Sequence, residues 1–201
     1  NISEITKYLK TEKIKVSVFG EFSCGKTTFL NALINEDILT VAYEPTTAVP
    51  TRIRYSKVFN ILVCKISGET LKLYSDNRKE IRWRRFIGRT GGLNILGLLK
   101  KKKYIIQTFL SKWTKEGNSA HEVKEVIIEL PLEWLKSGIE LIDTPGVNNE
   151  FIKHRKFTES VAQETDLAIM MIDARQGGGT KTAFEFMNDV NRFVQESVIV
   201  A

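Results

Sequence analysis

GEFSCGKTTFL, residues 20–30, is the stretch of sequence that decides the fold. It follows an alternating apolar run at 13–19, which predicts a strand with one buried face, and it leads into residues 26–35, whose apolar positions have helical spacing. Between them stand two glycines, a lysine and several small polar residues, which is more than a turn requires. The stretch therefore predicts a strand, a loop that wraps a charged group, and a helix.

Gly20, Gly25, Lys26 and Thr27 satisfy the phosphate-loop pattern G-x-x-x-x-G-K-[ST], with strand and helix on the sides that the pattern requires. In such a loop the glycines let backbone N–H groups point inward at phosphate oxygens, and the helix N-terminus adds a partial positive charge. We expect Lys26 to bind the β- and γ-phosphates, Thr27 to bind Mg²⁺ and Thr28 to contact the α-phosphate. A glycine turn that only caps a helix is the alternative.

A second motif, LIDTPG at 141–146, ends an apolar run. It places Asp143 at the carboxyl end of a strand, where open α/β sheets bind ligands and where a carboxylate can hold Mg²⁺ through water. Gly146 has no side chain to block its N–H from a γ-phosphate. An aspartate that caps a turn before proline is the alternative. The residues predicted to bind nucleotide are Gly20, Glu21, Phe22, Ser23, Cys24, Gly25, Lys26, Thr27, Thr28 and Gly146.

The stretch PTTAVPT, residues 45–51, is typical of a loop, because Pro45 and Pro50 oppose regular structure. A hydroxyl in a mobile loop can complete Mg²⁺ coordination only while the γ-phosphate is present. We expect Thr47 to supply this hydroxyl, with Thr46 as the second choice. A local turn closed by a threonine hydroxyl is the alternative.

The rest of the chain alternates strands with helices, which predicts an α/β fold with a largely parallel central sheet. Arg52 and Arg54 flank an apolar residue on one strand, and we expect them on a solvated face. The sequence SGE at 67–69 predicts a hairpin turn. Further strands are predicted at 52–55, 58–66, 69–74, 123–130, 138–143, 167–174 and 197–201. Further helices are predicted at 2–10, 104–115, 154–164 and 182–195.

Composition narrows the class of protein. The 201 residues suffice for one core, no run approaches the ~20 apolar residues of a membrane-spanning helix, and the two cysteines lack metal or disulfide spacing, which favours the cytoplasm. The net charge is +6, but ten Lys or Arg and one Glu give residues 78–103 a charge of +9. A basic insertion at 76–120 is therefore predicted. An anionic membrane surface and RNA are its candidate partners, and an insertion with merely solvated charges is the alternative.

With these motifs the chain resembles the dynamin superfamily of large GTPases, and bacterial dynamin-like proteins in particular. The interval of 117 residues from Lys26 to Asp143 is similar to that of dynamin-like domains, whereas small GTPases join the two motifs far more briefly. The resemblance is carried by GEFSCGKTTFLNALI (20–34), PTTAVPTRIRY (45–55) and the stretch from LPLEWL to MMIDA (130–174).

This resemblance implies a P-loop NTPase of the GTPase type, a three-layer sandwich with an inserted segment between switch I and the DTPG motif. It implies a single domain over 1–201. That domain would be incomplete, because the N/T-K-x-D motif that gives guanine specificity is expected directly after the strand at 197–201.

Roles for individual residues also follow from the resemblance. It implies that Ser23 helps to hold a charge-compensating K⁺ or Na⁺, that Thr47 binds Mg²⁺ and orients the attacking water, and that Asp143 and Gly146 belong to the second switch. Val147 stands where many small GTPases have a water-orienting glutamine, so catalysis would depend on the loop backbone, Thr47 and the cation. The implied catalytic residues are Ser23, Lys26 and Thr47, and the implied Mg²⁺ ligands are Thr27, Thr47 and Asp143.

The implied function is to bind GTP and GDP and to hydrolyse GTP, coupled to self-assembly and membrane remodelling, in a cytoplasmic protein peripheral to the membrane. The implied assembly is a homodimer across the nucleotide face. A nucleic-acid-binding or ribosome-associated GTPase switch is one alternative, and a nucleotide-dependent scaffold with little turnover is another.

Overall fold

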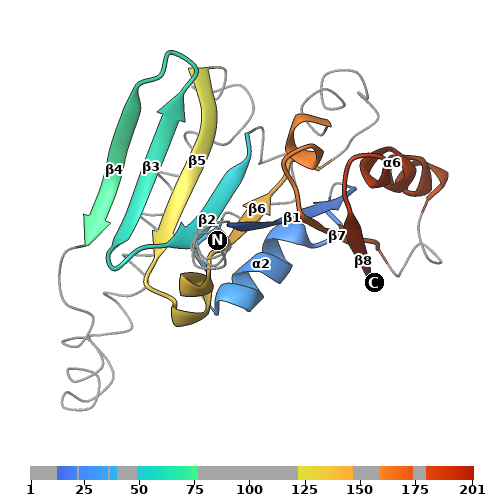
Figure 1. The fold of residues 1–201 in the computed structure, drawn as a ribbon, viewed down its shortest axis with the longest axis horizontal. Coiled ribbons are helices and arrows are strands. Elements are labelled where there is room, and N and C mark those ends of the chain that lie inside the picture. The colour runs from blue at the N-terminus through green and yellow to red at the C-terminus, as the bar shows by residue number, and fades with distance from the viewer. Residues whose placement is uncertain are drawn as a thin grey trace, which may run out of the picture.

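An eight-stranded sheet in the order β4-β3-β5-β2-β6-β1-β7-β8 organises the fold (Figure 1). The computed structural model describes residues 13–21, 23–35, 37–39, 49–76, 122–146, 159–173 and 180–201. The strands are β1 (Ile14–Gly20), β2 (Thr51–Tyr55), β3 (Phe59–Lys65), β4 (Thr70–Asp76), β5 (Val123–Leu130), β6 (Ile139–Asp143), β7 (Leu167–Met171) and β8 (Glu196–Val200). Helical elements in these ranges include α2 (Lys26–Ile34), the 3-10 helix η2 (Glu133–Ser137) and α6 (Lys181–Asn191).

The predicted α/β fold with a mostly parallel sheet is confirmed. Strands β6, β1, β7 and β8 run parallel to one another, and β2 is parallel to β5. The exceptions are the pairs β2–β6, β3–β5 and β3–β4, which are antiparallel. The last of these is the predicted hairpin, since only Ile66–Glu69 separate β3 from β4 and a connection that short allows antiparallel pairing alone.

Apolar side chains alternate between the two faces of the sheet and build a core on each. Val18 of β1 packs in the cluster that holds Leu30 and Ile34 of α2. The next residue, Phe19, packs on the opposite face against Phe186 of α6, with ring centroids 6.2 Å apart in an edge-on arrangement. Figure 1 shows α2 and α6 on opposite sides of β1. The helix–sheet–helix layering predicted from the family resemblance is therefore present. Burial of each fully enclosed side chain contributes about 2 kcal/mol.

Most element boundaries agree with the predictions within two residues. The helix predicted at 26–35 ends at Ile34, because Asn35 adopts a left-handed conformation (φ 54°) and its N–H bonds back to the carbonyl of Ala32. The 3-10 helix η2 was not predicted.

Some predictions lie outside the described residues, namely the helices at 2–10 and 104–115 and the basic segment 78–103. The helix predicted at 154–164 is described only from 159, with residues 159–162 helical. Within the described ranges, no helix is long and apolar enough to cross a membrane.

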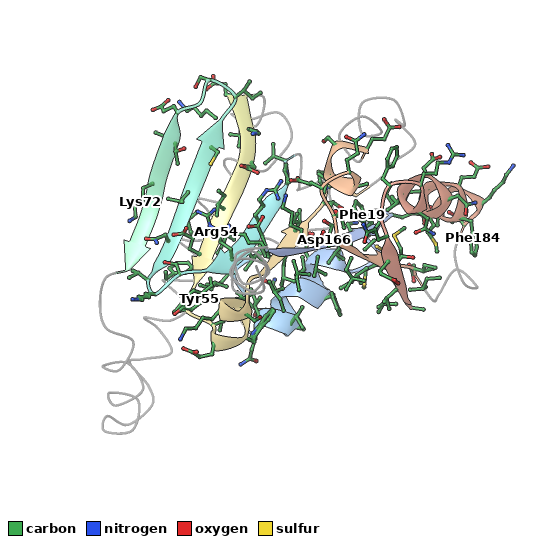
Figure 2. The ribbon with its side chains drawn as sticks, in the orientation of Figure 1. Phe19, Arg54, Tyr55, Lys72, Asp166 and Phe184 are labelled. Carbon is green, nitrogen blue, oxygen red and sulfur yellow. The ribbon has the colours of Figure 1, made fainter. Side chains whose placement is uncertain are left out.

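The prediction of a solvated face was wrong for Arg52. Its side chain is only 13% exposed, and its guanidinium donates to Glu125 at 2.5 Å, to Glu140 at 3.0 Å and to Glu164. Arg54, labelled in Figure 2, is 32% exposed and pairs with Glu129 on β5. Burial alone would raise the pKa of Glu164, but hydrogen bonds from Arg52 and Lys15 outweigh it and hold that pKa below its ordinary value.

Candidate functional site

The loop from Gly20 to Gly25 joins the carboxyl end of β1 to the N-terminus of α2 and has a backbone that demands glycine at two places. At Gly20 (φ 152°) a Cβ would lie 2.5 Å from the carbonyl oxygen of Met171 and 2.7 Å from Cys24 Sγ. Gly25 is the N-cap of α2 and is left-handed (φ 94°). Gly20 is therefore required because a side chain would collide with its neighbours, and Gly25 is required because of its left-handed backbone.

Lys26 is folded back over this loop. Its Nζ donates to the carbonyl oxygens of Gly20 at 3.0 Å and Glu21 at 2.7 Å, and the residue is 7% exposed. Its described hydrogen-bond partners are these two carbonyls and the Cys24 thiol, whose Sγ lies 3.9 Å away, and none of them is an anion. An ammonium group with such partners can still attract an anion. The loop thus presents a positive charge beside the positive end of α2.

Asp143 brings the second motif to the same place. Strand β6 lies beside β1 in parallel register, with Val18 opposite Asp143, so that the carboxyl ends of both strands meet. Thr27 Oγ1 donates to Asp143 Oδ2 at 3.0 Å across 116 residues of sequence. The next residue, Thr144, donates its hydroxyl to the carbonyl of Val18 at 2.6 Å and fixes the chain where it leaves the strand.

The carboxylate of Asp143 is buried and only half satisfied. The residue is 2% exposed, and its Oδ1 has no hydrogen-bond partner within the part of the chain that the structure describes. Burial raises the pKa of Asp143 to about 6, although the charge of Lys26 and the hydrogen bond from Thr27 both act to lower it. A cation bound beside this carboxylate would therefore offset the free-energy cost of burying its charge.

The donor atoms at this point fit Mg²⁺. A carboxylate and a threonine hydroxyl are hard oxygen ligands, and Mg²⁺ commonly takes one or two such protein ligands with phosphate and water. Among the described residues, no group of three or more His, Cys, Asp or Glu could hold a metal ion by itself. The set of Thr27 and Asp143 accordingly suits a metal that shares its coordination with a nucleotide.

The described residues on either side of the segment that contains Thr47 are held by α2 and by β6. Before it, both backbone groups of Leu39 bond to the buried side-chain amide of Asn31 on α2, at 2.9 and 3.0 Å. After it, Thr51 opens β2 directly opposite Asp143. Thr46 and Thr47 themselves lie outside the described residues.

The remaining predicted residues are placed as follows. Ser23 is exposed with a positive φ of 60°, and Thr28 is exposed on the first turn of α2. The Cys24 thiol is half-buried, 3.9 Å from Lys26 Nζ, and burial raises its pKa. Gly146 ends the described stretch that follows β6, while Phe22 and Val147 lie outside the described residues.

One contact at this site was not predicted. Thr180, the N-cap of α6, donates its hydroxyl to the carboxylate of Glu21 in the loop. The threonine that precedes an amphipathic run was available as a helix-start signal, but the helix was expected to begin only at 182. Nothing in the sequence linked it to the phosphate loop.

A family model described as the Dynamin family matches residues 16–200. The chain belongs to the dynamin family. This confirms the predicted dynamin-superfamily GTPase domain.

Dynamin-family relatives of the chain include two curated bacterial proteins. Dynamin-like protein 1 of Campylobacter jejuni is 26% identical over 189 residues, which cover 85% of this chain and 24% of the relative. The bacterial dynamin-like protein of Nostoc punctiforme is 29% identical over 151 residues, covering 74% of this chain and 19% of the relative. This chain thus spans a quarter or less of the length of these relatives.

Solved dynamin structures share the fold. One of them, described as an oligomerised bacterial dynamin pair that provides a mechanism for long-range sensing and tethering of membranes, matches with a TM-score of 0.55 and 20% identity. The match covers 98% of this chain and 27% of that chain. At this level of identity the likeness concerns the fold alone.

Proposed function

We propose that this dynamin-family domain binds GTP at the loop from Gly20 to Gly25 and hydrolyses it with Mg²⁺. The observation that carries the proposal is the contact of Thr27 with Asp143, whose second oxygen is buried without a described partner beside the charge of Lys26. Two motifs far apart in sequence thus place a cation, a hydroxyl and a carboxylate at one edge of the sheet. This is the set of groups that a phosphate–Mg²⁺ complex needs.

The residues divide the work according to their chemistry. The loop N–H groups and Lys26 bind the phosphate oxygens, and Thr27 and Asp143 hold the metal. Bound Mg²⁺ supplies neutralisation of the negative charge that develops on the transferred phosphoryl group. Because the metal needs an ionised carboxylate, its binding also lowers the pKa of Asp143 from about 6.

Hydrolysis requires a group that orients the attacking water. We assign this role to Thr47, in the segment that re-enters the sheet opposite Asp143, with Ser23 holding K⁺ or Na⁺ as a further positive charge. Ser23 is exposed in the loop and so is accessible to such an ion. The support for both assignments is the family resemblance together with these positions in the chain.

Self-assembly and membrane contact belong to the same proposal. The structural relative is described as an oligomerised pair that tethers membranes. By analogy we assign to this chain a homodimer across the nucleotide face and a peripheral association with membranes. The basic segment 78–103, with a charge of +9, is the candidate contact with anionic lipid.

Single-turnover hydrolysis of GTP tests the enzymatic proposal. The wild type should hydrolyse GTP with Mg²⁺ and should lose this activity with EDTA. Thr27→Val removes the hydroxyl but keeps the shape of the side chain, and it should lower the rate about 100-fold, the effect of removing one stabilising contact in a transition state. Thr70→Val, at a threonine on β4 far from the loop, is the matched control and should keep the wild-type rate. A Thr27→Val rate equal to that of Thr70→Val would refute the metal site.

A further inference from the structure

Glu21 is an acidic residue in a loop that is proposed to bind an anion. Burial is the main reason why the pKa of the Cys24 thiol is raised, and the negative charge of Glu21 raises it further. The charge of Glu21 therefore acts inside the loop. A free carboxylate here would repel phosphate and would compete for Lys26. The structure shows where this carboxylate is held instead.

Thr180 binds that carboxylate with a hydroxyl whose direction is fixed. The Thr180 oxygen accepts the backbone N–H of Ala183 at 3.0 Å, as the N-cap of α6. The single proton of the hydroxyl is then free for Glu21 Oε1, to which it is donated across 159 residues of sequence. The N-terminus of this eleven-residue helix adds a partial positive charge beside the carboxylate.

The helix that carries Thr180 is firmly attached to the strand that leads into the loop. Phe186 of α6 packs edge-on against Phe19, which directly precedes Gly20. Figure 2 labels Phe19 at the end of β1, beside α6. The anchor for Glu21 is thus fixed relative to the loop itself.

Glu21 is also tied to Lys26 through its backbone. The Glu21 carbonyl accepts Lys26 Nζ at 2.7 Å, and the N–H of Cys24 points to the same carbonyl at 3.5 Å. The position of the Glu21 peptide therefore sets the resting position of the ammonium group. One residue joins the α6 N-terminus to the cation of the loop.

We propose that Thr180 is a positioning residue for the phosphate loop, which holds the Glu21 carboxylate on α6 and so leaves Lys26 available to the nucleotide. This inference rests on the proposed function, because it concerns GTP binding at the same loop. It goes beyond the two motifs, because Thr180 lies outside both and Glu21 occupies a position at which the phosphate-loop pattern specifies no residue type.

The test is the affinity for GTP, measured by calorimetry, of variants that break and then rebuild the contact. Thr180→Asp keeps an N-cap acceptor for α6 but cannot donate, and it faces Glu21 with a like charge. We expect about tenfold weaker GTP binding, the effect of one charge-assisted hydrogen bond, in a variant that still unfolds cooperatively without nucleotide because α6 keeps its cap. Thr180→Ser keeps the hydroxyl and should bind GTP as the wild type does.

The double variant Glu21→Gln with Thr180→Asp decides between positioning and a general effect of charge. Its net charge equals that of the wild type, and the glutamine amide can donate to the new aspartate in the reverse direction. GTP affinity should return to within about twofold of the wild type. In steady state, Thr180→Asp should raise KM and leave kcat unchanged, because the contact acts on binding and not on the transition state alone.

The outcomes separate the two proposals. If the wild type binds GTP and Thr180→Asp binds it equally well, or if the double variant fails to recover, the positioning role is overturned while GTP binding stands. If the wild type binds no GTP in the same titration, the proposed function fails, and the positioning role with it.

Discussion

Replacement of Asp143 by Asn should stabilise the nucleotide-free protein at neutral pH. Asp143 is 2% exposed, and burial raises its pKa from 3.8 to about 6. A carboxyl group whose pKa is raised on folding costs nothing below its unfolded pKa and costs most above its folded pKa. The difference of about two in pKa corresponds to about 3 kcal/mol at pH 7.5.

The net gain is smaller than this cost. The asparagine keeps an acceptor for the Thr27 hydroxyl, but its buried NH₂ replaces an oxygen that has no partner among the described residues, at a cost of about 1 kcal/mol. We therefore expect Asp143→Asn to raise the free energy of unfolding by about 2 kcal/mol at pH 7.5. At pH 4.5, where Asp143 is mostly protonated in the folded state, the gain should be close to zero.

Urea unfolding in EDTA, without nucleotide, at these two pH values measures the effect. Asp166→Asn is the control. The Asp166 carboxylate is exposed and accepts the Lys15 N–H at 2.7 Å, so this variant should show no gain in stability at either pH. GTP with Mg²⁺ should stabilise the wild type but not Asp143→Asn. A variant less stable than the wild type at pH 7.5 would refute the reasoning that the site holds a strained, buried charge.

Three further predictions concern turnover and membranes. Thr47→Ala should bind GTP normally but hydrolyse it at least about tenfold more slowly in single-turnover assays, since its contacts belong to the transition state; turnover within twofold of the wild type would assign the role to another group. Ser23→Ala should reduce the stimulation of hydrolysis by K⁺ or Na⁺, measured as the rate with and without each ion, and a wild type indifferent to both ions would contradict this. Replacement of Lys100–Lys103 by Gln should weaken sedimentation with anionic liposomes by about tenfold or more without changing basal hydrolysis, because each basic residue near such a surface contributes about 1 kcal/mol. Unchanged sedimentation would indicate that the basic segment 78–103 has a structural role and does not bind membranes.

Local patterns were sufficient to predict most elements. The strand at 123–130 has the predicted limits because its apolar residues lie between a polar stretch and Pro131. The loop at Gly20 could be predicted because its glycines, lysine and threonine act within a few residues of one another. The parallel pairing of β1 with β6, which brings the ends of the two motifs together, was not predicted from the sequence.

Long-range partners could not be predicted in this way. The three carboxylates around Arg52 come from β5, from β6 and from the turn after the helical residues 159–162, so no local pattern marks that arginine as buried. The hydrogen bond from Thr180 to Glu21 has the same character. The antiparallel pairing of β2 with β6 was also missed, because strand–helix alternation predicts direction only where a helix forms the crossover.

The central claim, that the loop at Gly20 is a GTP site whose cation is Lys26, is tested most directly by calorimetric titration of GTP with Mg²⁺. Lys26→Ala is compared with Lys136→Ala, which removes a lysine that is 58% exposed on η2. The wild type and Lys136→Ala should bind GTP equally, and Lys26→Ala should bind about 100-fold more weakly, since charge-assisted contacts to phosphate are lost. Equal binding of GTP by Lys26→Ala and the wild type would contradict the account.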